Sequence, residues 1–285
     1  MVKHVIPKSL QEVLTLIYDD SYMLLAGGTD LMIQNRSSAN TPPHFKKNVC
    51  YIANLKELKY ITKDQHFIHI GGMTTFEELL QSPLIPDVFK DLIKDIASPG
   101  IRHLATLAGN IANASPAGDS LVYLYAVGAL IQLVSLKENR INSIEEIIIG
   151  PRKTAIRPHE IIKEVLIPIK TYTHQKWVKV GPRKADAISK VSFVGLAHIE
   201  NHMILSCSFA FGAIYKTVLH KPEIDALLFG IHTDELVNKI SSFIHAYEPY
   251  IQPIDDLRST KVYRKQVAIN LLKDFLYTLQ TDVSI

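Results

Sequence analysis

The chain has 285 residues, of which 47% are hydrophobic and 21% charged. This composition excludes a disordered or low-complexity protein and allows one large domain or two modest ones. The 31 Lys and Arg residues nearly balance the 28 Asp and Glu residues, and the basic residues are scattered along the chain. We therefore expect no nucleic-acid-binding surface.

Cysteine content and hydropathy limit the class further. The two cysteines, Cys50 and Cys207, are too few for a disulfide framework or for the thiolates of an iron–sulfur cluster, so any such cluster must lie on another chain. The N-terminus has no apolar segment followed by a cleavage site. The longest uncharged run, 120–136, is shorter than the ~20 residues that span a bilayer. We expect a cytoplasmic protein with no membrane association.

Strand and helix signals alternate over the first hundred residues. Ser9 and Glu12 form a capping box before an amphipathic helix, and an apolar strand leads into the glycine turn Gly27–Asp30. Ser98-Pro99-Gly100 is expected to break a later helix. The predicted elements are a helix over 9–19, a strand over 23–26, a helix from 31, strands at 49–53 and 66–70, a helix beginning near 75 and a helix over 87–96.

The stretch from Thr106 to Asp119 has almost wholly small or polar side chains, which cannot build a core by themselves, so we expect a loop there. After it the predicted elements are a helix over 120–127, a strand over 129–136, a turn at 137–140, strands at 164–169, 177–180, 188–199 and 203–215 with a hairpin turn at 200–202, and two or three closing helices, the last over 261–278. Near 168–175 the predicted elements change from alternating strands and helices to successive strands. We therefore predict two α+β domains, residues 1–170 and 171–285.

Two segments could bring backbone close to a ligand. The turn within Leu25–Leu31 fits a phosphate cradle, because glycines lack a Cβ and a helix follows. It lacks the lysine of a P-loop and the spacing of G-x-G-x-x-G, so a bare turn is an equal alternative. The second stretch adds Gly109 and Gly118, with polar groups on Asn110, Asn113, Ser115 and Asp119. Together they suggest an elongated ligand that carries phosphate.

Four segments carry a family resemblance. LLAGGTDL at 24–31, IRHLATLAGNIANASPAGD at 101–119, RKADAISKVS at 183–192 and PIDDLRSTKVYRKQ at 253–266 occur in the order and spacing seen in FAD-binding subunits of molybdenum hydroxylases. The chain resembles this family, which includes the xanthine dehydrogenase and carbon monoxide dehydrogenase flavoproteins, over nearly its whole length. The resemblance implies an α+β, two-subdomain FAD-binding fold of the vanillyl-alcohol oxidase type. A smaller C-terminal domain with a three-stranded antiparallel sheet and helices would follow.

The resemblance also implies which residues bind FAD. The first loop would wrap the diphosphate, and the second motif would contact the diphosphate, ribityl chain and flavin. The residues carried over are Leu24, Leu25, Ala26, Gly27, Gly28, Thr29 and Asp30 from the first loop, Ala105, Thr106, Leu107, Ala108, Gly109, Asn110 and Asp119 from the second motif, and Ile161, Ile162 and Lys179 from later segments. The family usually has two glycines where this chain has Ala108-Gly109. A positive φ at Ala108 would strain the backbone and weaken FAD binding.

The function implied by the resemblance is electron relay, with no catalytic side chain and no metal held by this chain. FAD would accept electrons from a [2Fe-2S] centre on a small partner subunit, in a complex with a large molybdopterin subunit, and would pass them to NAD or another acceptor. Two alternatives stay open. One is a stand-alone flavin oxidoreductase, and the other is a degenerate, non-enzymatic scaffold subunit, which Ala108 keeps open.

Other polar residues receive structural interpretations. His198 and His202 flank a hairpin turn, and His66 and His69 point to opposite faces of a strand, so neither pair is expected to bind zinc. Cys207 is expected to be a buried small hydrophobe and not a nucleophile. The last helix is expected to pack Val267, Leu271, Leu272 and Phe275 into a core. The basic residues Lys179, Arg183 and Lys190 form a loose cluster that could favour the flavin or the phosphates of the acceptor, and ordinary surface charge is an equal alternative.

Overall fold

The computed structural model describes residues 2–280, which form two compact units. The first unit comprises Met1–Pro86, Ala97–Ala114 and Ala129–Ile169, and the second comprises Asp87–Ile96, Ser115–Gly128 and Lys170–Ile285. Two of the segments of the second unit, Asp87–Ile96 and Ser115–Gly128, come from the first 170 residues, and their helices pack on the sheet of that unit. Each compact unit is therefore assembled from segments that are not consecutive in the sequence.

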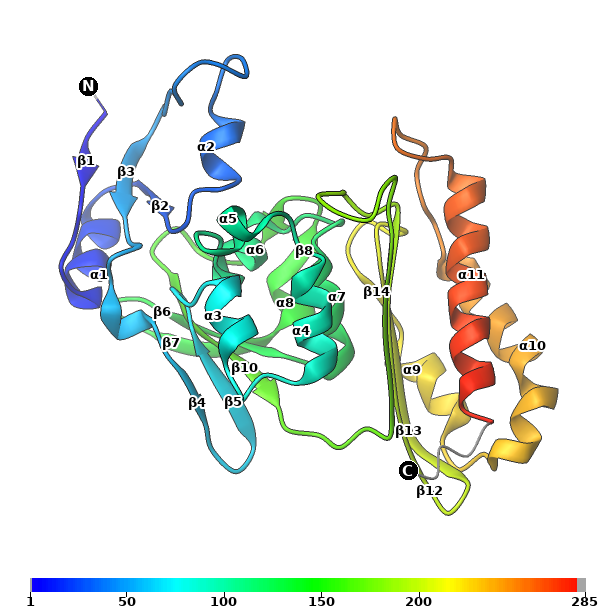
Figure 1. Cartoon of the computed structure of the whole chain (residues 1–285). Helices are drawn as coiled ribbons and strands as arrows, with labels where there is room; N and C mark the ends of the chain where they lie inside the picture. Colours follow the sequence, from blue (N-terminus) through cyan, green and yellow to red (C-terminus); the bar gives the residue numbers. More distant parts are fainter. Residues whose placement is uncertain (1, 281–285) are drawn as a thin grey trace. The chain divides into compact units, whose positions relative to one another are not determined.

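The first unit begins with a small parallel sheet and its covering helix (Figure 1). Strands β1 (His4–Val5), β3 (Asn48–Tyr51) and β2 (Tyr22–Leu25) lie in that order, and α1 (Leu10–Asp19) packs its apolar side against them. The Ser9 hydroxyl accepts a hydrogen bond from the Glu12 backbone N–H, as the capping box predicts. The helix–strand–turn order at the N-terminus is confirmed.

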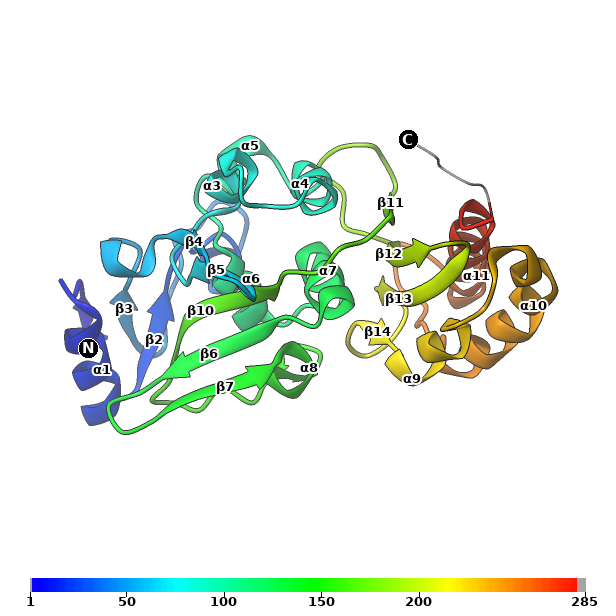
Figure 2. The same cartoon turned by 90° about the horizontal axis from the view of Figure 1, so that it is seen from below.

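A five-stranded antiparallel sheet completes the framework of this unit (Figure 2). Its order is β4 (Ile61–Lys63), β5 (Phe67–Gly71), β10 (Ile161–Pro168), β6 (Leu130–Val134) and β7 (Asn139–Ser143). Strand β7 was not predicted from the sequence, because its residues, Asn-Arg-Ile-Asn-Ser, show no apolar alternation. The remaining elements are α2 (Leu31–Gln34), η1 (Lys56–Leu58), α3 (Phe76–Gln81), α5 (Pro99–Arg102), α6 (Leu107–Asn113), α8 (Ile144–Ile147), β8 (Ile148–Gly150) and β9 (Lys153–Thr154).

The expected loop at 106–119 is wrong over its first half, where α6 forms. The Thr106 hydroxyl caps this helix by accepting a hydrogen bond from the Gly109 N–H, and Ala114 ends it with φ 47°. Leu107 and Ile111, one helical turn apart, are fully buried. Two apolar side chains and a cap are therefore enough to fix a short helix among small residues.

The second unit is built on the antiparallel sheet of β11 (His174–Val180), β12 (Val191–Glu200), β13 (Met203–Gly212) and the short β14 (Leu219–His220). Helices α10 (Leu236–Tyr247) and α11 (Lys261–Thr278) cover one face, and α4 (Asp87–Lys94) and α7 (Asp119–Val127) pack on the other (Figure 2). Short helices α9 (Pro222–Asp225), η2 (Ala226–Leu228), η3 (Thr233–Glu235) and η4 (Glu248–Tyr250) connect them. The α+β class is confirmed, and the two-residue β14 adds a fourth strand to the three expected.

The core of the second unit contains an aromatic cluster. Phe193 and Phe209 on the sheet contact Phe275 on α11, with ring centroids 5.7 Å apart for Phe209 and Phe275, and Phe211 packs on Phe193. Cys207 is buried here, and its thiol donates to the Asp225 carbonyl at 3.3 Å, so the burial expected of it is confirmed. Among the described residues, no helix is both long and apolar enough to cross a bilayer.

The histidine pairs lie in polar surroundings of their own. His202 sits in the expected hairpin turn with φ 62°, and its ring stacks on that of His232 at 5.4 Å between centroids. His69 lies between two carboxylates, with Nε2 3.0 Å from Asp64 and Nδ1 3.2 Å from Glu164. These contacts account for the histidines as structural polar groups.

Candidate cofactor-binding site

A pocket of about 400 Å³ lies within the first unit, where three segments distant in sequence converge. These are the glycine turn after β2, the start of α6 and the start of β10. Most of the residues predicted from the sequence line it together. They are Leu24, Ala26, Gly27, Gly28, Thr29, Asp30, Ala105, Thr106, Ala108, Gly109, Asn110, Ile161 and Ile162.

The glycine turn forms the first wall, and both of its glycines are required by geometry. A Cβ on Gly27 would lie 1.8 Å from the carbonyl oxygen of Leu104, so the two backbones touch. Gly28 has φ +70°, a conformation that favours glycine, and its carbonyl accepts a hydrogen bond from the Met32 N–H at the start of α2. The turn is therefore packed against protein at both Cβ positions, and it contributes backbone without side chains to the pocket that it lines.

The first turn of α6 forms the second wall. Ala108 is the second residue of this helix and has no positive φ, so the strain considered for it in the sequence analysis does not arise. Gly109 is the position where a Cβ would be crowded, because it would lie 2.9 Å from the Thr106 hydroxyl oxygen that caps the helix. Of the two positions where the family usually has glycine, the one that keeps it here is thus the position where the cap requires it.

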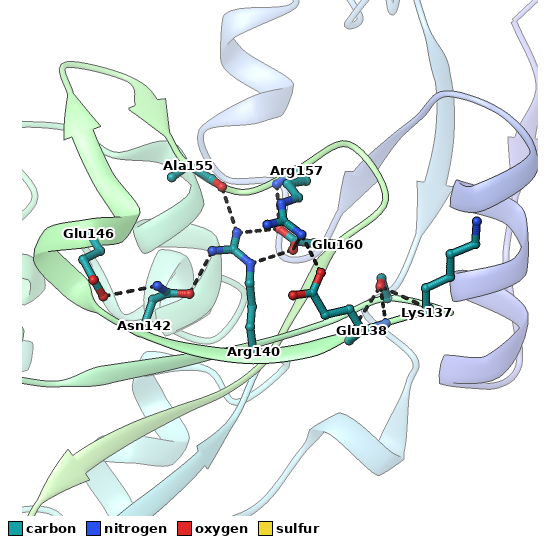
Figure 3. Close-up of polar contacts among 9 residues, drawn as sticks. Lys137, Glu138, Arg140, Asn142, Glu146, Ala155, Arg157 and Glu160 are labelled. Atoms are coloured by element: carbon teal, nitrogen blue, oxygen red, sulfur yellow. Dashed lines mark hydrogen bonds and ion pairs between the residues drawn. The ribbon is translucent and has the colours of Figure 1, made fainter.

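The third wall is the start of β10, with Ile161 and Ile162 nearly buried. The residue before them, Glu160, also lines the pocket, and both its oxygens accept hydrogen bonds from the Arg140 guanidinium at 2.7 Å (Figure 3). Burial opposes ionisation of Glu160, but the bonds from Arg140 and from the Arg157 backbone N–H outweigh it and lower the pKa of the carboxyl. This ion pair fixes the entry of β10 into the sheet.

Sequence reasoning missed the Arg140–Glu160 pair and a second polar group at the pocket. Asn113 accepts hydrogen bonds at its Oδ1 from Gln34 Nε2 and Arg152 Nη1, both at 3.1 Å, and donates through Nδ2 to Asp30. Asp30, Gln34, Asn113 and Arg152 all line the pocket. Nothing in the sequence indicates that Arg152, 39 residues from Asn113, lies beside it.

Four predicted residues do not line the pocket. Leu25 and Leu107 are buried in the core behind it. Asp119 and Lys179 belong to the second unit, where Lys179 Nζ lies 2.8 Å from Asp119 Oδ2 and the Ser189 hydroxyl donates to Oδ1 at 2.6 Å. Burial raises the pKa of the Asp119 carboxyl, although Lys179 and Ser189 act in the opposite direction.

Lys179 also donates to the Asp95 carbonyl at 2.7 Å, so its ammonium is held at two places in the second unit. The other two residues of the predicted basic group have contacts of their own. Arg183 donates to the Ala185 carbonyl at 2.9 Å, and Lys190 lies 5.5 Å from the centre of the Tyr263 ring. Lys179 is therefore part of a buried ion pair.

The lining fits FAD chemically. Gly27 and Gly28 contribute backbone without side chains to the lining, which suits a diphosphate, Arg152 supplies a cation, and Ile161 and Ile162 supply apolar contact for an aromatic ring system. An elongated, phosphate-bearing, partly aromatic ligand matches that distribution of groups.

Comparison with known proteins identifies the family. Residues 1–170 match the family described as the FAD binding domain in molybdopterin dehydrogenase, and residues 176–279 match the CO dehydrogenase flavoprotein C-terminal domain. The chain is 29% identical to the nicotinate dehydrogenase FAD-subunit of Eubacterium barkeri, over 79% of this chain and 78% of that protein. It is 25% identical to the glyceraldehyde dehydrogenase medium chain of Sulfolobus acidocaldarius, over 91% and 92% of the two chains.

A solved structure shares the fold over nearly the whole length. A chain of reconstituted CO dehydrogenase from Oligotropha carboxidovorans superposes with a TM-score of 0.88 at 22% identity, covering 98% of both chains. Both family domains, the pocket in the first and the antiparallel sheet of the second are thus present in one chain. This protein therefore belongs to the FAD-binding flavoprotein family of the molybdenum hydroxylases, as an oxidoreductase subunit with FAD as its cofactor.

Proposed function

We propose that this chain is the electron-transfer subunit of a molybdenum-containing hydroxylase or dehydrogenase complex. The observation that carries the proposal is the pocket at the glycine turn, which Gly27 and Gly28 line together with the first turn of α6 and the start of β10. The names of the relatives support it, since they include an FAD-subunit and medium chains of dehydrogenases.

The residues of this chain bind and orient the cofactor, and the flavin supplies the redox chemistry by accepting single electrons and delivering a pair. In the proposal the glycine turn and the first turn of α6 hold the diphosphate. Ile161 and Ile162 contact the flavin and keep water from it, and Asp119 and Lys179 are further contacts. No side chain of this chain is required as an acid or a nucleophile.

The proposed partners are a small subunit with a [2Fe-2S] centre and a large molybdopterin subunit, and the proposed acceptor is NAD or another soluble carrier. Two cysteines in 285 residues cannot supply the ligands of a cluster, so the electron donor has to be on another chain. Two relatives are named as medium chains, a name that implies further chains in their complexes and supports a multi-subunit assembly. We also propose that the chain works in the cytoplasm and divides by sequence into domains 1–170 and 171–285.

The scaffold alternative depended on strain at Ala108, and that residue is an ordinary helical position. Two functions are then to be distinguished. In one the chain is a subunit that passes on electrons from a partner, and in the other it is a flavoprotein that oxidises a substrate by itself. The two differ in which molecule reduces the flavin.

The test is to express the chain alone and together with its neighbouring genes. We expect a bound flavin spectrum with one FAD per chain, co-purification of a cluster-bearing subunit and a molybdopterin subunit, and reduction of the flavin, only in the complex, by the substrate that the molybdopterin subunit hydroxylates. NADH added to the flavin-loaded chain asks whether NAD is the acceptor. A flavin-free, persistently solitary chain would contradict the proposal.

A further inference from the structure

The turn between β8 and β9 holds an arginine in a conformation that favours glycine. The two strands are joined by Pro151-Arg152, and Arg152 has φ 53°. Proline followed by a residue of positive φ is the pattern of a type II turn, in which the second position is usually glycine or asparagine. An arginine there costs of the order of 1 kcal/mol, and such strain is typical of functional positions.

Arg152 is tied to the end of α6 by its backbone and its side chain. Its N–H donates to the Ala114 carbonyl at 2.9 Å, and Nη1 donates to Asn113 Oδ1 at 3.1 Å. Asn113 in turn contacts Gln34 and Asp30 beside the glycine turn. These bonds place the guanidinium at the pocket wall and join the hairpin, α6 and the glycine turn.

Arg152 differs from the other charged residues of the pocket lining, which are Asp30 and Glu160. Glu160 is neutralised by Arg140, and Asp30 accepts from Asn113. Among residues 2–280, no carboxylate forms an ion pair with Arg152, whose described side-chain partner is a neutral amide. Since a guanidinium has five N–H donors, most of the donors of Arg152 are available to an anion.

We propose that Arg152 is a further binding residue, which holds the phosphate-bearing ADP half of the dinucleotide. Arginine pairs with phosphate oxygens through two parallel N–H bonds, which glycine backbone alone cannot supply. Asn113 is a positioning residue in this proposal, because its Oδ1 accepts a hydrogen bond from the guanidinium and holds it at the pocket wall. This inference rests on the proposed function, and it adds the cation that anchors the cofactor.

The experiment compares four forms of the full chain: wild type, Arg152→Gln, Arg152→Gly and the control Lys153→Gln. The Gln variant removes the charge and keeps the turn strain, whereas the Gly variant removes both. Lys153 is the adjacent cation, is exposed and does not line the pocket. The flavin is removed, and the affinities for FAD, ADP and riboflavin are measured by titration at two salt concentrations, together with the melting temperature of the flavin-free chain.

We expect both Arg152 variants to lose FAD and ADP affinity by roughly 10- to 100-fold, as for a lost charged hydrogen bond, and to keep the wild-type affinity for riboflavin. The salt dependence of FAD binding should weaken in both, and Lys153→Gln should match the wild type. The flavin-free Gly variant should melt at or above the wild-type temperature, which a purely structural role of Arg152 would not allow.

Wild-type affinity for FAD and ADP in both Arg152 variants would overturn this inference and leave the proposed function intact. Equal losses for riboflavin and ADP would also overturn it, because they would indicate general damage to the pocket. A wild-type chain that binds no FAD would overturn the proposed function and the inference with it.

Discussion

Replacing Gly27 by alanine tests the pocket at its closest contact. The new Cβ would lie 1.8 Å from the Leu104 carbonyl oxygen and 2.5 Å from its carbon, whereas carbon–oxygen contacts need ~3.3 Å. Backbone must therefore move by roughly 1.5 Å at Leu104 or in the turn. No rotation of a flexible side chain can relieve the clash, so the cost should reach the upper end of the ~1–3 kcal/mol typical of overpacking.

The expected result is a melting temperature lowered by roughly 6–12 °C, since 1 kcal/mol corresponds to ~2–4 °C for domains of this size. FAD affinity should fall as well, because the displaced segment carries Ala105, whose carbonyl accepts from the Phe76 N–H, and leads into Thr106 at the cap of α6. Calorimetry of the flavin-free chain and titration with FAD measure the two effects.

Gly100→Ala is the matched control. A Cβ on Gly100 would meet nothing within 4 Å, and the residue lies in α5 without a positive φ. Alanine should therefore be neutral or stabilise by about 0.5–1 kcal/mol. If Gly27→Ala melts with the control and binds FAD as the wild type does, then the turn does not touch Leu104 and our reading of the pocket is refuted.

Three further predictions concern buried charges. Arg140→Ala should destabilise by about 3 kcal/mol in urea unfolding, because it leaves Glu160 buried without its partner, and adding Glu160→Gln should recover part of the loss; no recovery would contradict the pairing. Burial raises the pKa of Asp225 to about 7, so the folded state keeps a proton that the unfolded state loses above its usual range. Stability should therefore fall as pH rises from about 4 to 7, and Asp225→Asn should flatten that fall, whereas an unchanged slope would refute the assignment. Lys179→Met should destabilise the chain by leaving Asp119 unpaired, and adding Asp119→Asn should restore stability. If Lys179 also contacts the flavin, FAD affinity should fall in the single variant and remain low in the double variant. Recovery of both stability and FAD affinity in the double variant would make the role of Lys179 purely structural.

The local signals in the sequence predicted most elements well, because those elements are determined by nearby residues. The Ser9 cap and the capping box at Thr75 mark the starts of α1 and α3, and the apolar periodicity of the last helix places Leu272 and Phe275 in the core. The polar strand β7 was missed because it is held by pairing with β6, a partner that local alternation does not reveal. Strand pairing of this kind produces no hydrophobic periodicity in the sequence of β7.

From the sequence alone, the part of the pocket that could be predicted is the glycine turn, because its backbone conformation requires glycine. Gly27 and Gly28 showed the turn, and the family resemblance linked it to α6 and β10. The pairs Arg140–Glu160 and Arg152–Asn113 join residues that are 20 and 39 positions apart, between segments that the sequence shows only as turns or small-residue stretches. Charge pairing across such distances is visible once the fold is known.

The presence or absence of glycine in a motif did not predict where the backbone is strained. It suggested strain at Ala108, where there is none, and it gave no sign of strain at Arg152. Ala108 replaces a glycine and costs nothing, because the helix that begins at Thr106 gives it a negative φ. Arg152 occupies a left-handed position where glycine would be easier, and no glycine pattern drew attention to it. The backbone conformation decides whether a side chain is tolerated, and the strained exception is the more informative of the two. Arg152 keeps an unfavourable conformation at a pocket wall, and the proposed bond to an anion would give its side chain a role that offsets this cost.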